Sequence, residues 1–111
     1  MKYLVTGGCG FIGCNFALKL LGRGDGVVLL DNLSRKGAVQ NLAHVQSLYP
    51  LVGFLHADVR IDSFPLRQIV EEVDCIFHLA GQVAVTQSIL EPRDDFAVNA
   101  LGTLNVLEAV R

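Results

Sequence analysis

The chain has 111 residues, of which 51% are hydrophobic and 18% are charged, and its net charge at pH 7 is −2. This length corresponds to one domain or less, and the hydrophobic content is high enough for a packed core, which excludes a disordered chain. The slightly acidic balance argues against a nucleic-acid partner, and no apolar run is long enough to predict a membrane span.

A short strand at Lys2–Thr6 is the first predicted element, and an amphipathic helix from Phe11 to about Gly22 is the second. The turn between them reads TGGCGFIG over residues 6–13, with glycines at positions 7, 10 and 13. A strand, a glycine turn and a helix in this order bring bare backbone and free helix N–H groups against a pyrophosphate. The alternative is an ordinary strand-to-helix turn. The apolar side chains expected on the helix are Phe11, Ala17, Leu18 and Leu21.

The next strand, Val27–Asp31, is a continuous apolar run of the kind buried on both faces of a parallel sheet. Asp31 follows Gly13 at close to the spacing of about 20 residues at which an acidic side chain meets the adenosine ribose of a dinucleotide. A carboxylate there repels a 2′-phosphate and therefore favours NAD over NADP. Two alternatives stay open: Asp31 is a loop-entry acid, or Arg35 and Lys36 accept a 2′-phosphate.

Alternating elements continue to the end of the chain. The predicted elements are a helix at Ala38–Tyr49, a strand at Val52–His56, a helix from Asp62 or Ser63 to Glu72 with Pro65 in its first turn, a strand at Asp74–Leu79, a loop or short helix at Ala80–Leu90 and a long helix at Pro92–Arg111. This order predicts an α/β fold, a partial Rossmann fold whose parallel sheet has the strand order 3-2-1-4 and is flanked by helices. We expect residues 1–111 to be the front of a larger domain, because the fourth strand would otherwise be an exposed apolar edge.

Further candidates lie where the later strands end, which is the edge at which this fold binds ligands. Asp58 is placed to accept a hydrogen bond from an adenine amino group, with Val59 beside the ring; the alternative is an acid that caps the next turn. The small residues Ala80 and Gly81 would let the backbone approach the cofactor. His78 is interpreted as a packing residue, and Asn99 as a buried polar group that either approaches the cofactor or only pins its helix to the sheet.

Three cysteines, Cys9, Cys14 and Cys75, lack paired spacing, and together with the three histidines they form no metal-ligand pattern. We expect reduced thiols in a cytoplasmic protein without a signal peptide. Cys9 lies inside the glycine turn, where a helix N-terminus favours a thiolate, although a small side chain that merely fits is the preferred interpretation.

Five segments together resemble the extended short-chain dehydrogenase/reductases, and among these the NAD-dependent nucleotide-sugar epimerases and dehydratases. The segments are TGGCGFIG (6–13), DNLSRKG (31–37), ADVR (57–60), HLAGQVAV (78–85) and NALGTLNVLEAVR (99–111). The second and fourth are most similar to those of the CDP-tyvelose (CDP-paratose) 2-epimerases. UDP-glucose 4-epimerases and sugar dehydratases are the alternatives within the family.

This resemblance implies a cofactor, NAD, and a nucleotide-sugar substrate whose carbon gives up a hydride and takes it back on the opposite face. It also implies a set of cofactor-binding residues. Gly7, Gly10, Phe11 and Ile12 would surround the pyrophosphate, Asp31 and Asn32 the adenosine ribose, Asp58 and Val59 the adenine, and Leu79, Ala80 and Gly81 the rest of the dinucleotide. The family's tendency to dimerise makes a homodimer through the Pro92–Arg111 helix an expectation.

The catalytic Tyr-x-x-x-Lys of that family is missing. Tyr3 and Tyr49 are the chain's tyrosines, and glycines, Gly7 and Gly53, stand four residues after them. We therefore predict no catalytic residue and no substrate domain in these 111 residues, and no epimerase activity from them alone. The leading hypothesis is the N-terminal part of a nucleotide-sugar epimerase. The alternatives are a stand-alone, non-catalytic NAD-binding module and a purely structural assembly unit.

Overall fold

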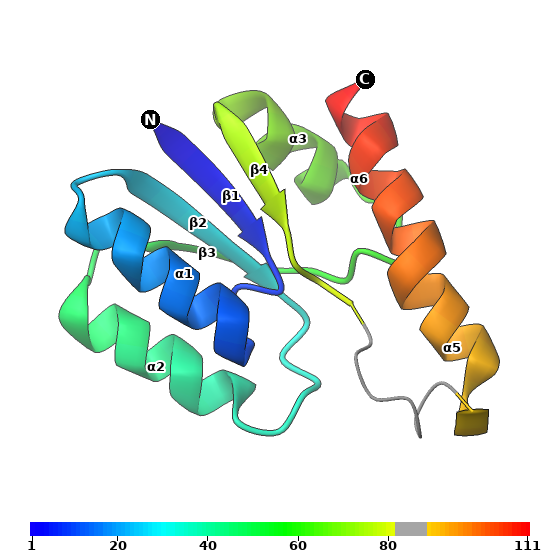
Figure 1. Cartoon of the computed structure of the whole chain (residues 1–111). Coiled ribbons are helices and arrows are strands. Elements are labelled where there is room, and N and C mark those ends of the chain that lie inside the picture. The colour runs from blue at the N-terminus through cyan, green and yellow to red at the C-terminus, as the bar shows by residue number, and fades with distance from the viewer. Residues whose placement is uncertain (82–88) are drawn as a thin grey trace.

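Four strands form the sheet of the computed structural model, which describes residues 1–81 and 89–111 (Figure 1). They are β1 (Lys2–Thr6), β2 (Gly26–Asp31), β3 (Gly53–His56) and β4 (Cys75–His78). All pairings are parallel and the order is β3-β2-β1-β4, which confirms the predicted α/β class and topology. Because all four strands are parallel, their carboxyl ends lie at one edge of the sheet.

Both faces of the two central strands are buried, as the continuous apolar run of β2 predicts. Val27 and Leu29 pack into the core on one face of the sheet, whereas Val28 and Leu30 pack into the core on the other. Alternate side chains of a strand point to opposite faces, so two cores require apolar residues at every position. The outer strands β3 and β4 are only half-buried.

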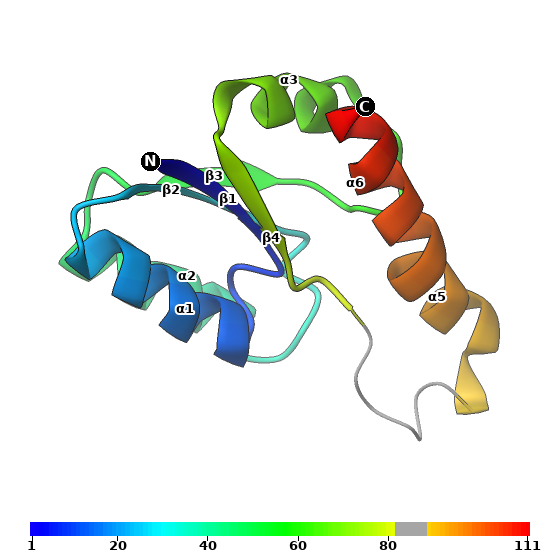
Figure 2. The same ribbon diagram turned by 45° about the horizontal axis from the view of Figure 1, so that its top comes forward.

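Two helices cover each face of the sheet (Figure 2). Helices α1 (Phe11–Gly22) and α2 (Ala38–Leu48) lie on one face, and α3 (Phe64–Glu72) and α6 (Gly102–Val110) lie on the other. The start of α3 was predicted from its capping residues: the Ser63 hydroxyl accepts a hydrogen bond from the Leu66 N–H at 3.3 Å, and Pro65 occupies the first turn.

The α1 helix has the predicted bounds, but part of its predicted apolar face is wrong. Phe11 is 80% exposed, and the buried side chains of the helix include Cys14, Ala17 and Leu20. Phe11 is the first helical residue and lies beyond the end of β1, so the sheet offers it nothing to pack against. The spacing of apolar residues therefore predicted the helix correctly, but it placed Phe11 in the core, where it does not lie.

The predicted final helix is present but not uniform. It begins as α5 (Pro92–Phe96), continues through η1 (Ala97–Leu101), a π-helical turn, and ends as α6. Figure 1 shows these three segments as one continuous rod that extends past the carboxyl edge of the sheet. Of the predicted loop or short helix at Ala80–Leu90, residues 82–88 lie outside the described residues, and so does part of the HLAGQVAV motif.

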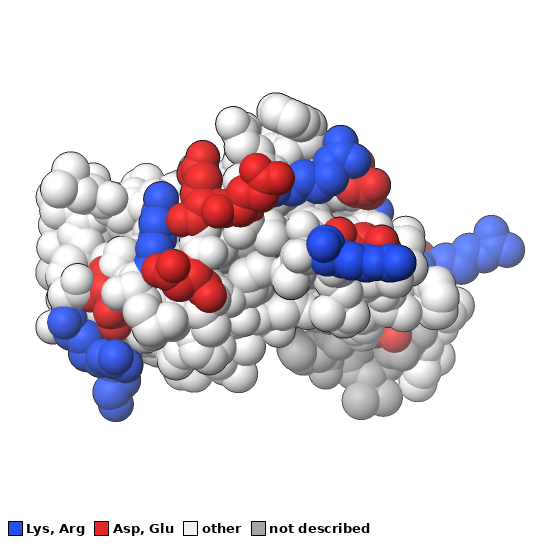
Figure 3. Space-filling view, turned by 90° about the horizontal axis from the view of Figure 1, so that it is seen from above, with Lys and Arg blue, Asp and Glu red and all other residues white. Residues whose placement is uncertain are grey.

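Charged side chains of both signs alternate over the face seen in Figure 3, between broad uncharged areas. Among the described residues, no helix is long and apolar enough to cross a membrane.

Candidate functional site

The glycine turn after β1 is shaped by close backbone contacts. Gly7 has φ +65°, a conformation that favours glycine, and a Cβ built on it would lie 2.8 Å from the backbone of Leu79 and Ala80. A Cβ on Gly13 would lie 2.2 Å from the Gly7 carbonyl oxygen. The first glycine therefore lets the end of β4 close on the turn, and the third lets α1 pack against it.

Gly10, the second glycine of the motif, differs from these two. Among the residues that the structure describes, a Cβ there would have only the Gly7 carbonyl oxygen within 4 Å, at 3.3 Å. Protein packing therefore gives little reason for a glycine at this position, and the space beside it is open. Gly10 is also the N-cap of α1, and the first hydrogen bond of the helix is the one donated by the Cys14 N–H to the Gly10 carbonyl, at 2.9 Å. The preceding N–H groups of the helix have no acceptor within it and carry its positive end.

Asp31, at the end of β2, has two hydrogen bonds to the backbone. Its Oδ2 accepts from the Cys9 N–H at 3.0 Å, and its Oδ1 accepts from the Leu33 N–H at 2.8 Å. The second bond accompanies a left-handed turn at Leu33, with φ 60°. An ionised carboxylate offers about four lone-pair positions, so two remain after these bonds. Asp31 is thus both a brace of the glycine turn and an acceptor with capacity for a further donor.

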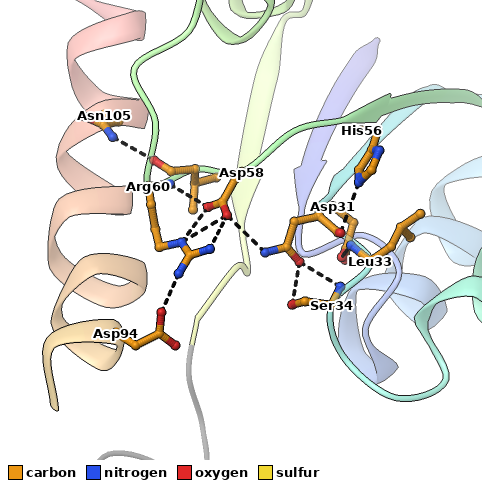
Figure 4. A network of polar contacts seen from close by, with 10 residues as sticks. Asp31, Leu33, Ser34, His56, Asp58, Arg60, Asp94 and Asn105 are labelled. Atoms are coloured by element: carbon orange, nitrogen blue, oxygen red, sulfur yellow. Dashed lines mark hydrogen bonds and ion pairs between the residues drawn. The ribbon is translucent and has the colours of Figure 1, made fainter. Parts of the chain in front are cut away.

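A second carboxylate, Asp58, lies beyond β3 in a network that Figure 4 shows. Arg60 binds both of its oxygens, with Nε–Oδ1 at 2.9 Å and Nη2–Oδ2 at 2.5 Å, and the Asn32 amide donates to Oδ2 at 3.4 Å. Arg60 Nη1 also forms an ion pair with Asp94 of α5. The hydrogen bonds from Arg60 lower the pKa of the Asp58 carboxyl to about 2, so it is charged at neutral pH.

The turn-capping alternative for Asp58 is present in the structure, because Oδ1 also accepts from the Arg60 N–H at 3.0 Å. Neighbouring Val59 is buried, and its carbonyl accepts from the Asn105 amide at 2.8 Å. These contacts fix the chain after β3 against α6.

The end of β4 meets the loop after β2. Arg35 Nη2 donates to the Gly81 carbonyl at 3.0 Å, and a Cβ on Gly81 would lie 3.1 Å from the Asn99 side-chain oxygen. Asn99 therefore lies beside the β4 end, but it is exposed, so its predicted burial is wrong. The residue lies on the π-helical turn, none of whose residues is buried.

Cys9 and His78 have the structural roles that were preferred for them. Cys9 is fully buried, and burial, followed by the nearby Asp31 charge, raises the pKa of its thiol to about 12. The thiolate interpretation is therefore wrong. His78 has both ring nitrogens in hydrogen bonds with hydroxyl groups, Nδ1 with Thr6 at 2.7 Å and Nε2 with Thr103 at 3.1 Å, and burial lowers its pKa.

One cavity of about 970 Å³ brings the predicted cofactor residues together. It opens along the carboxyl edge of the sheet and is lined by all of them except Asn99: Gly7, Gly10, Phe11, Ile12, Asp31, Asn32, Asp58, Val59, Leu79, Ala80 and Gly81. A smaller cavity of about 400 Å³ shares Asn32, Ala57 and Asp58 with it and continues toward Pro65. The cavity is thus continuous from the glycine turn to the residues after β3.

Sequence reasoning missed part of this lining. Arg60 was present in the ADVR motif, but no role was assigned to it, and Asp94 and Val98 of the last helix were not considered. The alternation of acid and base in Asp58-x-Arg60 was a usable signal for a local ion pair. No local signal identifies Asp94, because its contact with Arg60 depends on how α5 crosses the end of the sheet.

A family model described as GDP-mannose 4,6 dehydratase matches residues 4–111. The chain is 51% identical to the CDP-paratose 2-epimerase of Salmonella typhi, over the whole of this chain and 33% of that protein. It is 40% identical to the UDP-glucose 4-epimerase of Mycolicibacterium smegmatis, over the whole of this chain and 35% of that protein. The chain thus spans about a third of the length of the curated relatives it matches.

Solved structures give the same result. The UDP-glucose 4-epimerase of Thermus thermophilus, in complex with NAD, superposes with a TM-score of 0.82 and 39% identity, over 98% of this chain and 33% of that one. The dTDP-glucose 4,6-dehydratase DesIV of Streptomyces venezuelae, with NAD bound, superposes with a TM-score of 0.87 and 36% identity, over 98% and 35%.

Proposed function

Because the chain belongs to the GDP-mannose 4,6 dehydratase family, we propose that it is the NAD-binding part of a nucleotide-sugar epimerase. The identity of 51% with a CDP-paratose 2-epimerase supports inversion at C2 of a CDP-linked sugar as the reaction of the whole enzyme. The proposal includes a cytoplasmic location, since the three cysteines are free thiols. It also includes a homodimer, since Leu104 and Leu107 of α6 are exposed.

The single observation that carries the proposal is the cavity at the carboxyl edge of the sheet. Its lining includes the bare backbone of the glycine turn, the N-terminus of α1, and the carboxylates Asp31 and Asp58. The site fits a dinucleotide because the open space beside Gly10 is where a Cβ would project, next to helix N–H groups that attract a diphosphate.

Each part of the lining has a role in this proposal. The Phe11 and Ile12 N–H groups bind the pyrophosphate, and the free lone pairs of Asp31 accept from the ribose hydroxyls. Asp58 accepts from the adenine amino group, and the backbone from Leu79 to Gly81 lines the remainder. Asp31 selects NAD over NADP because a negative carboxylate at the ribose repels a 2′-phosphate.

Bound NAD would supply a hydride acceptor that oxidises the sugar carbon and then returns the hydride. The residues of this chain bind and orient the cofactor, and none of them is a tyrosine–lysine pair suited to move the sugar hydroxyl proton. We therefore assign to these 111 residues the binding of NAD, and not the transfer of the sugar hydroxyl proton.

The test is titration calorimetry of the chain with NAD and NADP, using Gly10→Ala as the informative variant. Of the described parts of the chain, the added methyl group meets only the Gly7 carbonyl, but it projects into the proposed pyrophosphate position, so we expect at least a tenfold loss of NAD affinity. Gly22→Ala is the matched control, because a Cβ there would lie 3.5 Å from the Tyr49 hydroxyl, away from the cavity. If titration of the unmodified chain with millimolar NAD produces no heat, the proposal is wrong.

A further inference from the structure

A hydrogen-bonded chain of side chains runs behind the wall of the cavity and has no part in the function described so far. It begins at Thr6, the last residue of β1, passes through His78, its register partner on β4, and ends at Thr103 on α6. These residues lie on the face of the sheet that α3 and α6 cover, because Leu4 and Ile76, two residues before Thr6 and His78, pack into the core on that side.

Thr6 holds the cavity wall directly. Its carbonyl accepts from the Leu79 N–H at 3.1 Å, and its hydroxyl accepts from the Ala80 N–H at 3.2 Å. After Gly7 the backbone turns to β2, where the Gly8 N–H donates to the Leu30 carbonyl at 3.2 Å, and the acceptor of the Ala80 N–H is a side chain. The Thr6 hydroxyl thus extends the pairing of β1 and β4 by one residue, into the stretch that lines the cavity.

The donor and the acceptor of each hydrogen bond between Thr6, His78 and Thr103 can be assigned. The Thr103 hydroxyl donates its only proton to the Asn99 carbonyl, at 2.6 Å, so toward His78 it accepts, and His78 Nε2 must carry a hydrogen. Burial lowers the pKa of His78, which keeps the ring neutral. A neutral ring with hydrogen on Nε2 has a bare Nδ1, which accepts the Thr6 hydroxyl proton. The Thr6 oxygen then presents a lone pair to Ala80.

We propose that His78 is a positioning residue of the NAD cavity: it orients the Thr6 hydroxyl toward the Ala80 N–H, and Thr103 holds the histidine in the tautomer this requires. The inference rests on the proposed function. It also assigns a role to the π-helical turn. The Asn99 carbonyl on this turn accepts the Thr103 hydroxyl proton, and this fixes the donor and acceptor of the hydrogen bonds from Thr103 to Thr6.

The test compares Thr103→Val, which has a similar shape without the hydroxyl, with Thr103→Ser, which keeps it. We expect NAD to bind about three- to tenfold more weakly to the valine variant, the size of effect of one hydrogen bond. The serine variant should bind within twofold of the unmodified chain. AMP, which reaches only the adenosine side, should bind equally to all three, whereas a general loss of structure would weaken AMP and NAD together.

¹⁵N NMR of the histidine rings is a second test, and it needs no ligand. His78 in the unmodified chain should be neutral with hydrogen on Nε2, and His78→Phe identifies its signals. Hydrogen on Nδ1, or equal NAD affinity of the valine and serine variants, overturns the inference while leaving the proposed function intact. Absence of NAD binding by the unmodified chain overturns the proposed function, whatever the tautomer.

Discussion

The carboxylates of Asp31 and Asp58, which the sequence assigns to ligand binding, also hold the protein's own backbone and side chains in place. Asp31 accepts from two backbone N–H groups that hold the glycine turn and the loop after β2. Asp58 is bound by Arg60, which in turn reaches Asp94 of α5. A loss of ligand affinity on removing either carboxylate would therefore mix two effects, so Gly10 is the better residue for testing the cavity.

The Asp58 carboxyl gives stability a specific pH dependence. Its pKa is about 2 in the folded chain, against 3.8 for the free side chain. Since the folded-state pKa is the lower of the two, the stabilisation is complete above pH 4 and is lost as pH falls toward 2. Allowing for partial solvent screening, we expect Asp58 to contribute about 1–2 kcal/mol across this window.

Urea unfolding at pH 5 and pH 2 measures this contribution. Asp58→Asn should be less stable than the unmodified chain at pH 5, and the difference should shrink by that amount at pH 2. Asp62→Asn, which replaces a side chain that is 57% exposed, is the control and should show little change. A difference for Asp58→Asn that is the same at both pH values contradicts the assignment.

At the scale of elements, the position of α1 depends on a single missing methyl group. The built Cβ of Gly13 lies 2.2 Å from the Gly7 carbonyl oxygen, and the obstacle is backbone rather than a flexible side chain. Gly13→Ala should therefore push the helix from the turn and destabilise the fold by about 1–3 kcal/mol, the usual cost of overpacking. Chemical denaturation measures it, with Gly22→Ala on the same helix as control; equal stability of the two variants would show that the turn yields easily.

The last helix is attached to the rest of the molecule at two points along its length. Arg60 ties the α5 segment to the chain after β3, and Thr103 ties the start of α6 to β4. The π-helical turn lies between these two attachments.

For the whole molecule, the core that α1 and α2 cover shields the three thiols to different degrees. Cys9 is fully buried in the core that α1 and α2 cover, and burial raises the pKa of its thiol to about 12. Cys14 is also buried, whereas Cys75 on the outer strand β4 is half-buried. The reactivity of Cys9 and Cys14 should therefore follow unfolding of the molecule, whereas Cys75 should react in the folded state.

Labelling with Ellman's reagent at pH 8 tests this. We expect one fast thiol, removed by Cys75→Ser, and two slow thiols whose rates rise with urea in parallel with global unfolding. Mass spectrometry identifies the sites. Fast native labelling of Cys9 would show that the glycine turn opens independently of the core.

Much of the fold and most of the site followed from the sequence, because both depend on local patterns. Continuous apolar runs in Val27–Asp31, glycines at fixed places between strand and helix, and the Ser63–Pro65 cap each act over a few residues. In this fold ligands bind at the carboxyl ends of the strands, so residues such as Gly10, Asp31 and Asp58 could be assigned to one site before any contact was known.

Only the tertiary structure decided which partners those residues take. The ion pair of Arg60 with Asp94, the brace from Asp31 to the Cys9 N–H, and the exposure of Phe11 and Asn99 depend on how separate elements cross. A hydrogen bond requires two groups within about 3 Å, and sequence periodicity places residues on a face but not at that distance. The sequence alone therefore determined the sheet and most of the residues that line the cavity, and the tertiary structure determined which partners hold those residues in place.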